Sequence, residues 1–263
     1  MHRGLILLVV ILLAACATSP LGRSQLRLFP PGEMVALGAT AFDKLKAETP
    51  QSRDPRVNRY VRCVAAAITA DLHAAQGQPA WEVVVFADDS ANAFALPGGK
   101  IGVYTGLLQV AVNQDQLATV IGHEVAHVLA DHPNERISTM YATQLGLQQI
   151  VSILGGASSP GQQQLMGLLG VGAQVGVILP FSRTQEREAD LLGLDLMARA
   201  GFDPRQSLDL WQRMAQAGGA RPPEFLSTHP SSETRMKDLS ERLPVVVPVY
   251  EQARAQGKRP NCS

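Results

Sequence analysis

Two histidines four positions apart, with a glutamate beside the first, are the residues of this sequence best suited to chemistry. His123, Glu124 and His127 form an H-E-x-x-H pattern inside an apolar stretch. Four residues are close to one helical turn, so both imidazoles point from the same helix face and can share one Zn²⁺. Glu124 lies next to them, where a carboxylate can take a proton from a water molecule. The pentapeptide alone is only moderately specific, because such strings also arise by chance.

A catalytic zinc site needs a third protein ligand, and a carboxylate pair downstream offers one. Glu186 and Asp190 are four positions apart in a helical stretch and share a face, whereas Glu188 lies well round the helix. We therefore expect Glu186 to bind the metal and Asp190 to hydrogen-bond a ligand or the reacting groups. Taken alone, this stretch fits equally a charged helix face that lies in water.

The elements that must position these residues are predicted from apolar spacing and from turn residues. Helices are expected over residues 32–48, 55–76, 113–132, 181–200, 204–217 and 231–243. Strands are expected over residues 81–87 and on both sides of a turn at 97–99, and two helices are expected around a loop at 155–161. A few early strands followed by helices predict an α+β fold that is mostly helical, with a small early β-sheet.

The composition agrees with a globular chain of one domain. The 263 residues have a formal net charge of +0, 46% hydrophobic residues and 5% aromatic residues. A neutral chain gives no indication of a nucleic-acid partner. We expect one folded domain over residues 32–243, between a tether at 16–31 and a C-terminal tail at 244–263.

The first residues are typical of an export signal. A basic start precedes an uncharged run over residues 5–13, which is too short for a membrane-spanning helix of ~20 residues. Leu13-Ala-Ala-Cys16 resembles the bacterial lipobox, in which the leader is cut before the cysteine and the thiol is lipidated. We expect a signal peptide over 1–15 and a lipidated Cys16. An ordinary signal peptide with an incidental cysteine is the alternative.

The two remaining cysteines, Cys63 and Cys262, would lie in the oxidising space outside the cytoplasm. Paired thiols usually become a disulfide there, which would join the C-terminus to an early helix. Two unrelated thiols are the alternative.

Four segments together resemble one peptidase family. They are His123-Glu-Val-Ala-His127, Glu186-x-x-Ala189-Asp190, the stretch Asn92-Ala-Phe-Ala-Leu-Pro-Gly-Gly, and Leu226-Ser-Thr-His229-Pro. This set is similar to the gluzincin peptidases that include the CAAX prenyl endopeptidase and HtpX. The lipobox narrows the resemblance to the LoiP-like and BepA-like periplasmic members. BepA-like members carry a C-terminal helical repeat domain, and only about twenty residues follow Leu243 here, so the LoiP-like members are more similar.

The resemblance implies a zincin-type domain with one Zn²⁺ held by His123, His127 and Glu186. It implies Glu124 as the catalytic base and Asp190 as a proton donor, although a carboxylate so placed could instead orient a histidine. Of the other histidines, His132 lies at the expected C-terminal end of the metal helix, where it suits the helix dipole.

His229 has three interpretations that the sequence leaves open. In BepA-like members the matching histidine can occupy the open zinc position and hold the enzyme off. The same side chain could instead stabilise the oxyanion of the active form. A plain loop histidine before Pro230 is the third interpretation.

The segment before the metal helix is a candidate for substrate binding. Its hairpin could offer an edge strand to an extended peptide, through Asn92, Phe94, Gly98 and Gly99. A purely structural turn is the alternative.

The sequence therefore predicts a zinc endopeptidase. By resemblance, we expect it to be lipid-anchored in the outer membrane, to face the periplasm and to degrade misfolded or stalled envelope proteins. Outer-membrane assembly machinery and other proteases are candidate partners. An envelope chaperone or assembly factor, with its metal site shut by His229 and the loop at 155–161, is the alternative. An integral-membrane protease that uses the apolar residues 165–179 is a third, weaker hypothesis.

Overall fold

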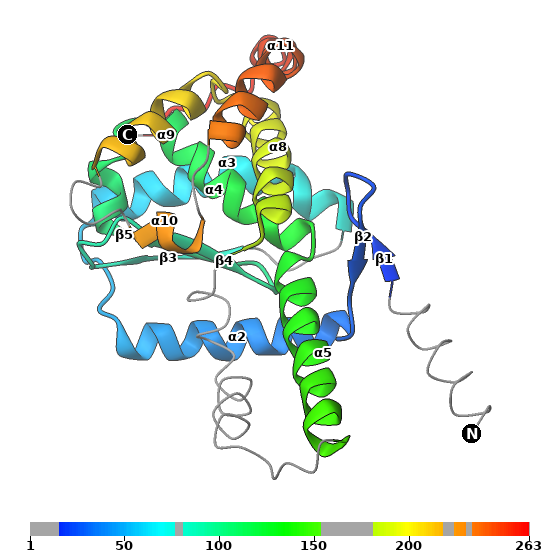
Figure 1. The fold of residues 1–263 in the computed structure, drawn as a ribbon. Coiled ribbons are helices and arrows are strands. Elements are labelled where there is room, and N and C mark those ends of the chain that lie inside the picture. The colour runs from blue at the N-terminus through cyan, green and yellow to red at the C-terminus, as the bar shows by residue number, and fades with distance from the viewer. Residues whose placement is uncertain (1–15, 77–80, 154–180, 218–223, 230–232, 263) are drawn as a thin grey trace.

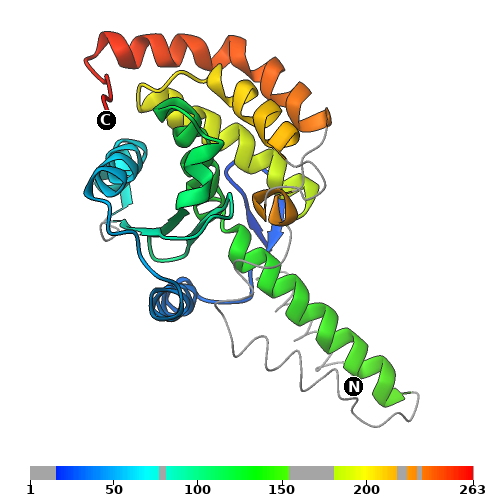
Figure 2. The ribbon, with the colours of Figure 1, turned by 90° about the vertical axis from the view of Figure 1, so that its left-hand side faces the viewer.

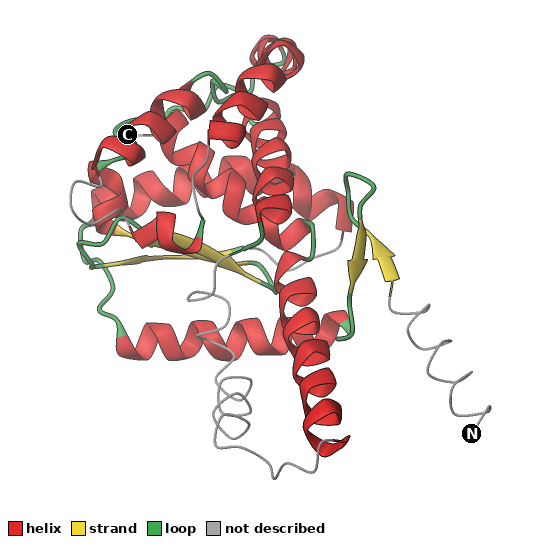
Figure 3. Cartoon of the chain, in the orientation of Figure 1, coloured by secondary structure: helices red, strands yellow, loops and turns green. Residues whose placement is uncertain are grey.

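The computed structural model describes residues 16–76, 81–153, 181–217, 224–229 and 233–262. The expected signal peptide, the loop at 155–161 and the apolar segment at 165–179 lie outside this part of the chain. Helices make up most of it, around small sheets (Figure 3), and the predicted α+β class is confirmed. None of the helices described is both long and apolar enough to cross a membrane.

The helices and strands follow the chain in a simple order. The strands are β1 (Cys16–Thr18), β2 (Ser24–Leu26), β3 (Glu82–Phe86), β4 (Ala93–Leu96) and β5 (Lys100–Tyr104). The helices are α2 (Pro31–Glu48), α3 (Pro55–Gln76), α4 (Gln114–Leu129), α5 (His132–Ile153), α8 (Arg183–Arg199), α9 (Gln206–Ala217), α10 (Glu224–Thr228) and α11 (Glu233–Ala255), with a short 3-10 helix at Thr105–Gln109.

The main sheet has three strands in the order β3-β5-β4. β5 lies in the centre, parallel to β3 and antiparallel to β4. The turn from β4 to β5 uses two glycines in the left-handed region, Gly98 at φ 84° and Gly99 at φ 71°, a conformation that other residues adopt only at a cost. Because β5 is central, β4 is left as an edge strand of this sheet.

Helices cover both faces of the sheet (Figure 1). α3 and α4 pack on one face, and α2 lies across the other. Under α2 the apolar side chains are mainly aromatic, and they are Phe42, Phe86, Phe94 and Tyr104 together with Ala41, Val84 and Leu96. On the opposite face, the larger core joins α3 and α4 to the C-terminal helices. The metal helix α4 therefore packs on one face of the sheet, and α2 covers the other face.

α4 and α8 form the most extensive helix pair, and glycines allow their close approach. A Cβ atom at Gly193 on α8 would lie 2.8 Å from the backbone nitrogen of His123 on α4. Each helix has a side-chain cap at its N-terminus: Asn113 accepts from the Gln116 amide, and Ser182 and Gln185 form a capping box. The caps determine where each helix begins, and the close approach at Gly193 sets how the two metal-binding helices face each other.

α11 is longer than the predicted helix at 231–243, and it includes part of the expected tail. It runs through Pro244 and Pro248 to Ala255, and Figure 2 shows it crossing over α8 and α9. Proline removes one backbone hydrogen bond and usually ends a helix. Here the buried side chains Leu239, Val246 and Ala253 continue at seven-residue spacing through both prolines. The packing of these buried side chains offsets the cost of the backbone hydrogen bonds that the two prolines remove.

The expected tether at 16–31 is also ordered. β1 and β2 form an antiparallel hairpin that pairs Cys16 with Leu26. The Gln25 side chain is buried and donates to the Ala130 carbonyl at 2.7 Å, and Arg23 pairs with Glu135 and Glu188. These side chains contact partners far away in the sequence. A prediction from local composition, which gave a flexible linker, could not include such contacts.

Candidate metal centre

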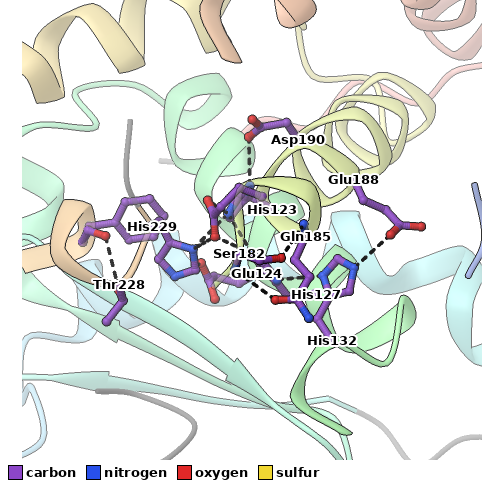
Figure 4. A network of polar contacts seen from close by, with 12 residues as sticks. His123, Glu124, His127, His132, Ser182, Gln185, Glu188, Asp190, Thr228 and His229 are labelled. Atoms are coloured by element: carbon purple, nitrogen blue, oxygen red, sulfur yellow. Dashed lines mark hydrogen bonds and ion pairs between the residues drawn. The ribbon is translucent and has the colours of Figure 1, made fainter. Parts of the chain in front are cut away.

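Four buried side chains from three separate parts of the chain meet at one point, and Figure 4 labels the three histidines among them. His123 and His127 come from α4, Glu186 from the first turn of α8, and His229 from the residue after α10. One ligand atom from each lies within 4.8 Å of the others. The three ligands predicted from sequence are thus brought together, and a fourth donor joins them.

The distances between these donors fit a tetrahedral metal site. Nε2 of His123 lies 3.0 Å from Nε2 of His127 and 3.1 Å from Nδ1 of His229. Oε1 of Glu186 lies 2.9 Å from that Nδ1 and 3.4 Å from Nε2 of His127. Four donors around a zinc ion, with bonds of ~2.0–2.1 Å, are separated by about 3.3 Å.

The chemistry of the donors gives the same result. A single proton cannot satisfy three imidazole nitrogens that face one another, whereas one cation can satisfy all of them. Burial lowers the pKa of His123, but its contacts with Asp190 and Glu186 outweigh this and raise it to about 9. Although burial raises the pKa of Glu186, hydrogen bonds from the histidines hold it well below its usual range. The residues present therefore fit Zn²⁺.

Glu124 lies beside the donors and is poised as a base. Its side chain is 3% exposed, and burial raises the pKa of the carboxyl above its usual value. The backbone amide of Ala95, on the edge strand β4, donates to Oε2 at 3.3 Å. The carboxylate is thus held between the metal ligands and the outer edge of the sheet.

His229 stands between Glu124 and the metal ligands. Its Nδ1 faces the donor cluster, while Nε2 lies 3.3 Å from Oε1 of Glu124. The ring is nearly parallel to those of Phe225 and Phe181, at 20° and 28°. Of the three interpretations of His229, this geometry favours the one in which the imidazole takes the fourth ligand position.

Asp190 does not point toward the reacting side of the site. Its Oδ1 lies 3.0 Å from Nδ1 of His123, the ring nitrogen that faces away from the donor cluster. Both of its oxygens accept from Arg235, at 2.6 and 2.7 Å. Burial raises the pKa of Asp190, yet the charge of Arg235 brings the net value below normal. This geometry favours the alternative to the expected proton-donor role, in which the carboxylate orients His123.

His132 and Glu188 were not expected to take part, and both lie directly behind the site. His132 is fully buried, with Nδ1 2.9 Å from Nδ1 of His127 and Nε2 3.2 Å from Glu188 (Figure 4). The ring of Phe181 stacks on His127 at 3.9 Å between centroids. The H-E-x-x-H pattern carries no signal for these partners, because they meet His127 only in the tertiary structure.

The edge strand β4 presents other residues on its outer side than those expected to bind substrate, and substrate binding there stays a prediction. Asn92 accepts from the Tyr104 amide, so alternate residues from Asn92 onward bond to β5, and Ala93 and Ala95 face the free side. Phe94 packs in the aromatic core below the sheet. Gly98 and Gly99 lie in the turn, against Val35 and Trp81. The turn glycines are therefore structural.

Cys63 and Cys262 form a disulfide, with Cα atoms 5.6 Å apart. It joins α3 to the segment that follows α11. Cys16 is the first residue of β1, and its lipidation stays a prediction.

Comparison with known proteins identifies similar sequences. Residues 51–243 match the profile of Peptidase family M48. The chain is 39% identical over 181 residues to the mitochondrial metalloendopeptidase OMA1 of Saccharomyces cerevisiae, which covers 66% of this chain and 50% of that protein. The OMA1 protein of Schizosaccharomyces pombe is 42% identical over 166 residues, covering 62% and 47%. The β-barrel assembly-enhancing protease of Escherichia coli K12 is 28% identical over 228 residues, covering 84% and 46%.

Two consequences follow from these matches. The chain spans about half the length of the relatives it matches. The expected location in an outer membrane is overturned, because the relatives with 39% and 42% identity are mitochondrial enzymes and the β-barrel assembly-enhancing protease is more distant at 28%.

Proposed function

Since this chain belongs to peptidase family M48 and is a zinc metalloendopeptidase, we propose that it cleaves unfolded or unassembled proteins and that His229 holds it in a latent state. The observation that carries the proposal is the position of Glu124. Its carboxylate touches both the free edge of β4, through Ala95, and the imidazole that fills the fourth ligand position.

The peptidase chemistry uses few residues. Zinc, when bound by His123, His127 and Glu186, supplies a Lewis acid that polarises a peptide carbonyl and makes a nearby water more acidic. Glu124 takes the proton from the attacking water, and the burial that raises its pKa makes the carboxylate a stronger base than a free one. The same carboxyl can then pass the proton to the departing amine.

The edge strand explains why an unfolded substrate is favoured. The amides of Ala93 and Ala95 already donate to Asn92 and Glu124, but their outward-facing carbonyls can pair with a peptide, and only when that peptide is extended. A peptide that adds to this edge lies next to Glu124, because the Ala95 amide is 3.3 Å from the carboxylate. Folded proteins rarely offer an unpaired extended segment. The name of the β-barrel assembly-enhancing protease links that relative to β-barrel assembly, which supports β-barrel proteins as one substrate class for this chain.

Latency follows from the position of His229. Its ring fills the space between Glu124 and the metal ligands, where the attacking water has to be. α10, which carries this residue, is tied to the chain before β4, since the Phe225 amide donates to the Ala91 carbonyl at 3.1 Å. Opening the site therefore requires α10 to move or His229 to rotate out of its aromatic slot.

The proposal is tested by cleavage of casein, an unfolded substrate, with two variants. Glu124→Gln should keep zinc and lose cleavage, because the amide cannot accept the proton. His229→Ala should raise the initial rate several-fold, because water can then occupy the fourth position. A folded protein of similar size should resist all forms. Casein cleavage by Glu124→Gln equal to that of the wild type would contradict the assigned base, and an unchanged rate for His229→Ala would contradict latency.

The same position of His229 supports a second candidate function. A site that is mostly shut fits a chaperone or assembly factor that binds unfolded chains along β4 without cutting them. Complementation of a deletion strain separates the two functions. Rescue by Glu124→Gln favours binding, and failure of that variant to rescue favours proteolysis.

A further inference from the structure

A chain of polar contacts runs from the zinc ligand His127 to the N-terminal hairpin, and the peptidase chemistry makes no use of it. We propose that this hairpin, residues 16–26, helps to hold a zinc ligand in the geometry that binds the metal. Arg23 positions His127 through Glu188 and His132. The proposal concerns how tightly and in what geometry the metal is held, so it is independent of the substrate.

The contact between His127 and His132 determines which side chain donates and which accepts at each step of this series of contacts. His127 turns Nε2 toward the donor cluster, so as a neutral ligand it carries its proton on Nδ1. That Nδ1 lies 2.9 Å from Nδ1 of His132, which must therefore accept. His132 in turn has to carry its own proton on Nε2. Only this tautomer of His132 supports the ligand.

Glu188 selects that tautomer. Its Oε2 lies 3.2 Å from Nε2 of His132 and can only accept, which keeps the proton on that nitrogen. Without the carboxylate, His132 could move its proton to Nδ1, and two N–H groups would then oppose each other at 2.9 Å. Glu188 is 4% exposed, so its charge needs compensation inside the protein.

The hairpin supplies that compensation. Nε of Arg23 donates to Oε2 of Glu188 at 3.1 Å, and the Leu21 amide donates to Oε1 at 3.3 Å. These partners lie 165 and 167 positions from Glu188 in the sequence. The hairpin thus satisfies both oxygens of the carboxylate that sets the tautomer.

Arg23 itself is held in a defined geometry. Nη2 donates to Glu135 at 2.7 Å, and Gln185 donates to the same Glu135 oxygen at 2.8 Å. Within the hairpin, the Arg23 amide donates to the Ser19 hydroxyl at 3.1 Å. The Arg23 guanidinium is shared between two carboxylates at fixed positions. The position of the hairpin therefore determines the position of Glu188 and, through it, that of His132.

Zinc affinity of the full chain is the direct test. Arg23→Gln should weaken zinc binding about tenfold in competition with a chromophoric chelator, and Arg23→Lys should recover part of the loss. The matched control is Arg27→Gln, because Arg27 follows the same hairpin but pairs with the side chain of Asp131, which lies outside the series Arg23–Glu188–His132–His127 even though its backbone precedes His132. Zinc affinity equal in Arg23→Gln and Arg27→Gln would overturn the proposal.

Three further variants test the internal steps. Glu188→Gln and His132→Phe should each weaken zinc binding about 10–100-fold, and His132→Asn, which keeps an acceptor near Nδ1, should be affected less. The visible spectrum of the Co²⁺-loaded protein reports ligand geometry. It should change in Arg23→Gln and stay that of the wild type in Arg27→Gln.

A merely structural role for the hairpin predicts a different pattern. It would lower the melting temperature of the metal-free protein, with the Co²⁺ spectrum and the zinc affinity of the folded fraction unchanged. That pattern in Arg23→Gln and Glu188→Gln would contradict the proposal. We expect instead that circular dichroism shows a folded metal-free protein in both variants, and that the zinc affinity and the Co²⁺ spectrum change.

Discussion

At the scale of single residues, the metal centre depends as much on the partner behind each ligand as on the ligand itself. Asp190 holds Nδ1 of His123, and His132 holds Nδ1 of His127. Each partner is in turn held by a charged pair, with Arg235 behind Asp190 and Glu188 behind His132. Both rings are therefore fixed in orientation before a metal binds, which lowers the cost of assembling the site.

Asp190→Asn distinguishes a positioning role from a proton donor. We expect zinc affinity to fall about 10–100-fold, with the rate of casein cleavage at saturating zinc close to that of the wild type. A lost proton donor would instead lower that rate by about 10²–10⁴ with zinc retained. Asp195→Asn is the matched control, since Asp195 lies on the same helix and pairs with Arg242 away from the ligands.

Arg235→Met tests the electrostatics of the buried site. Arg235 pairs with Asp190 and lies 2.8 Å from Oε2 of Glu186, so its loss leaves two buried carboxylates without this countercharge. We expect the metal-free protein to lose about 3–5 kcal/mol of stability. Zinc brings positive charge to the same place, so the loss should be smaller in the metal-loaded protein. Thermal unfolding with and without a chelator measures both, and an equal loss in the two forms would contradict this account.

The sequence predicts the residues whose relation is local. His123 and His127 share a helix face, as do Glu186 and Asp190, and spacing alone shows this. Spacing alone does not predict the contact between His132 and His127. Asp131, at φ 55°, breaks the helix and turns the following residue back toward His127. Glu188 was placed correctly off the metal-binding face, but its partners come from α5 and the hairpin.

At the scale of elements, the crossing of α4 and α8 decides whether Glu186 reaches the histidines. Gly193→Ala should separate the helices, because the new Cβ would meet backbone atoms of α4 at 2.8 and 2.9 Å, which cannot rotate away. We expect a loss of about 1–3 kcal/mol of stability together with weaker zinc binding. Gly32→Ala on α2 is the control, since its Cβ would meet nothing within 4 Å. Equal zinc affinity in both variants would show that the crossing tolerates a side chain.

Most elements around the site were predictable, and the exceptions share a cause. The strands of the main sheet and the helices from α2 to α4 follow clear apolar periodicity and turn residues. The hairpin at 16–26 and the continuation of α11 through Pro244 and Pro248 lack local signals. They are stabilised by distant partners, Glu135 and Glu188 for the hairpin and the faces of α8 and α9 for α11. Local propensity cannot anticipate tertiary contacts of this kind.

At the scale of the whole molecule, the two ends of the described chain act on opposite ends of the metal helix. The N-terminal hairpin reaches the C-terminal end of α4, where Gln25 caps the Ala130 carbonyl. The C-terminal segment reaches the beginning of the same helix, where Gln114 donates to the Pro260 carbonyl and accepts from the Cys262 amide. α4 is therefore fixed at both ends by parts of the chain that are remote in sequence.

The disulfide between Cys63 and Cys262 secures the second of these attachments. It closes a loop with a sequence separation of 199, and loss of such a constraint costs about 5 kcal/mol in the chain-entropy model. The double variant Cys63→Ala/Cys262→Ser should therefore melt about 10 °C or more below the wild type. Dithiothreitol should lower the wild-type melting temperature by a similar amount and leave that of the variant unchanged. Zinc content should stay at one ion per chain in both, because neither cysteine belongs to the group of metal ligands. If the two proteins melt together under oxidising conditions, the bond does not constrain the unfolded chain as argued.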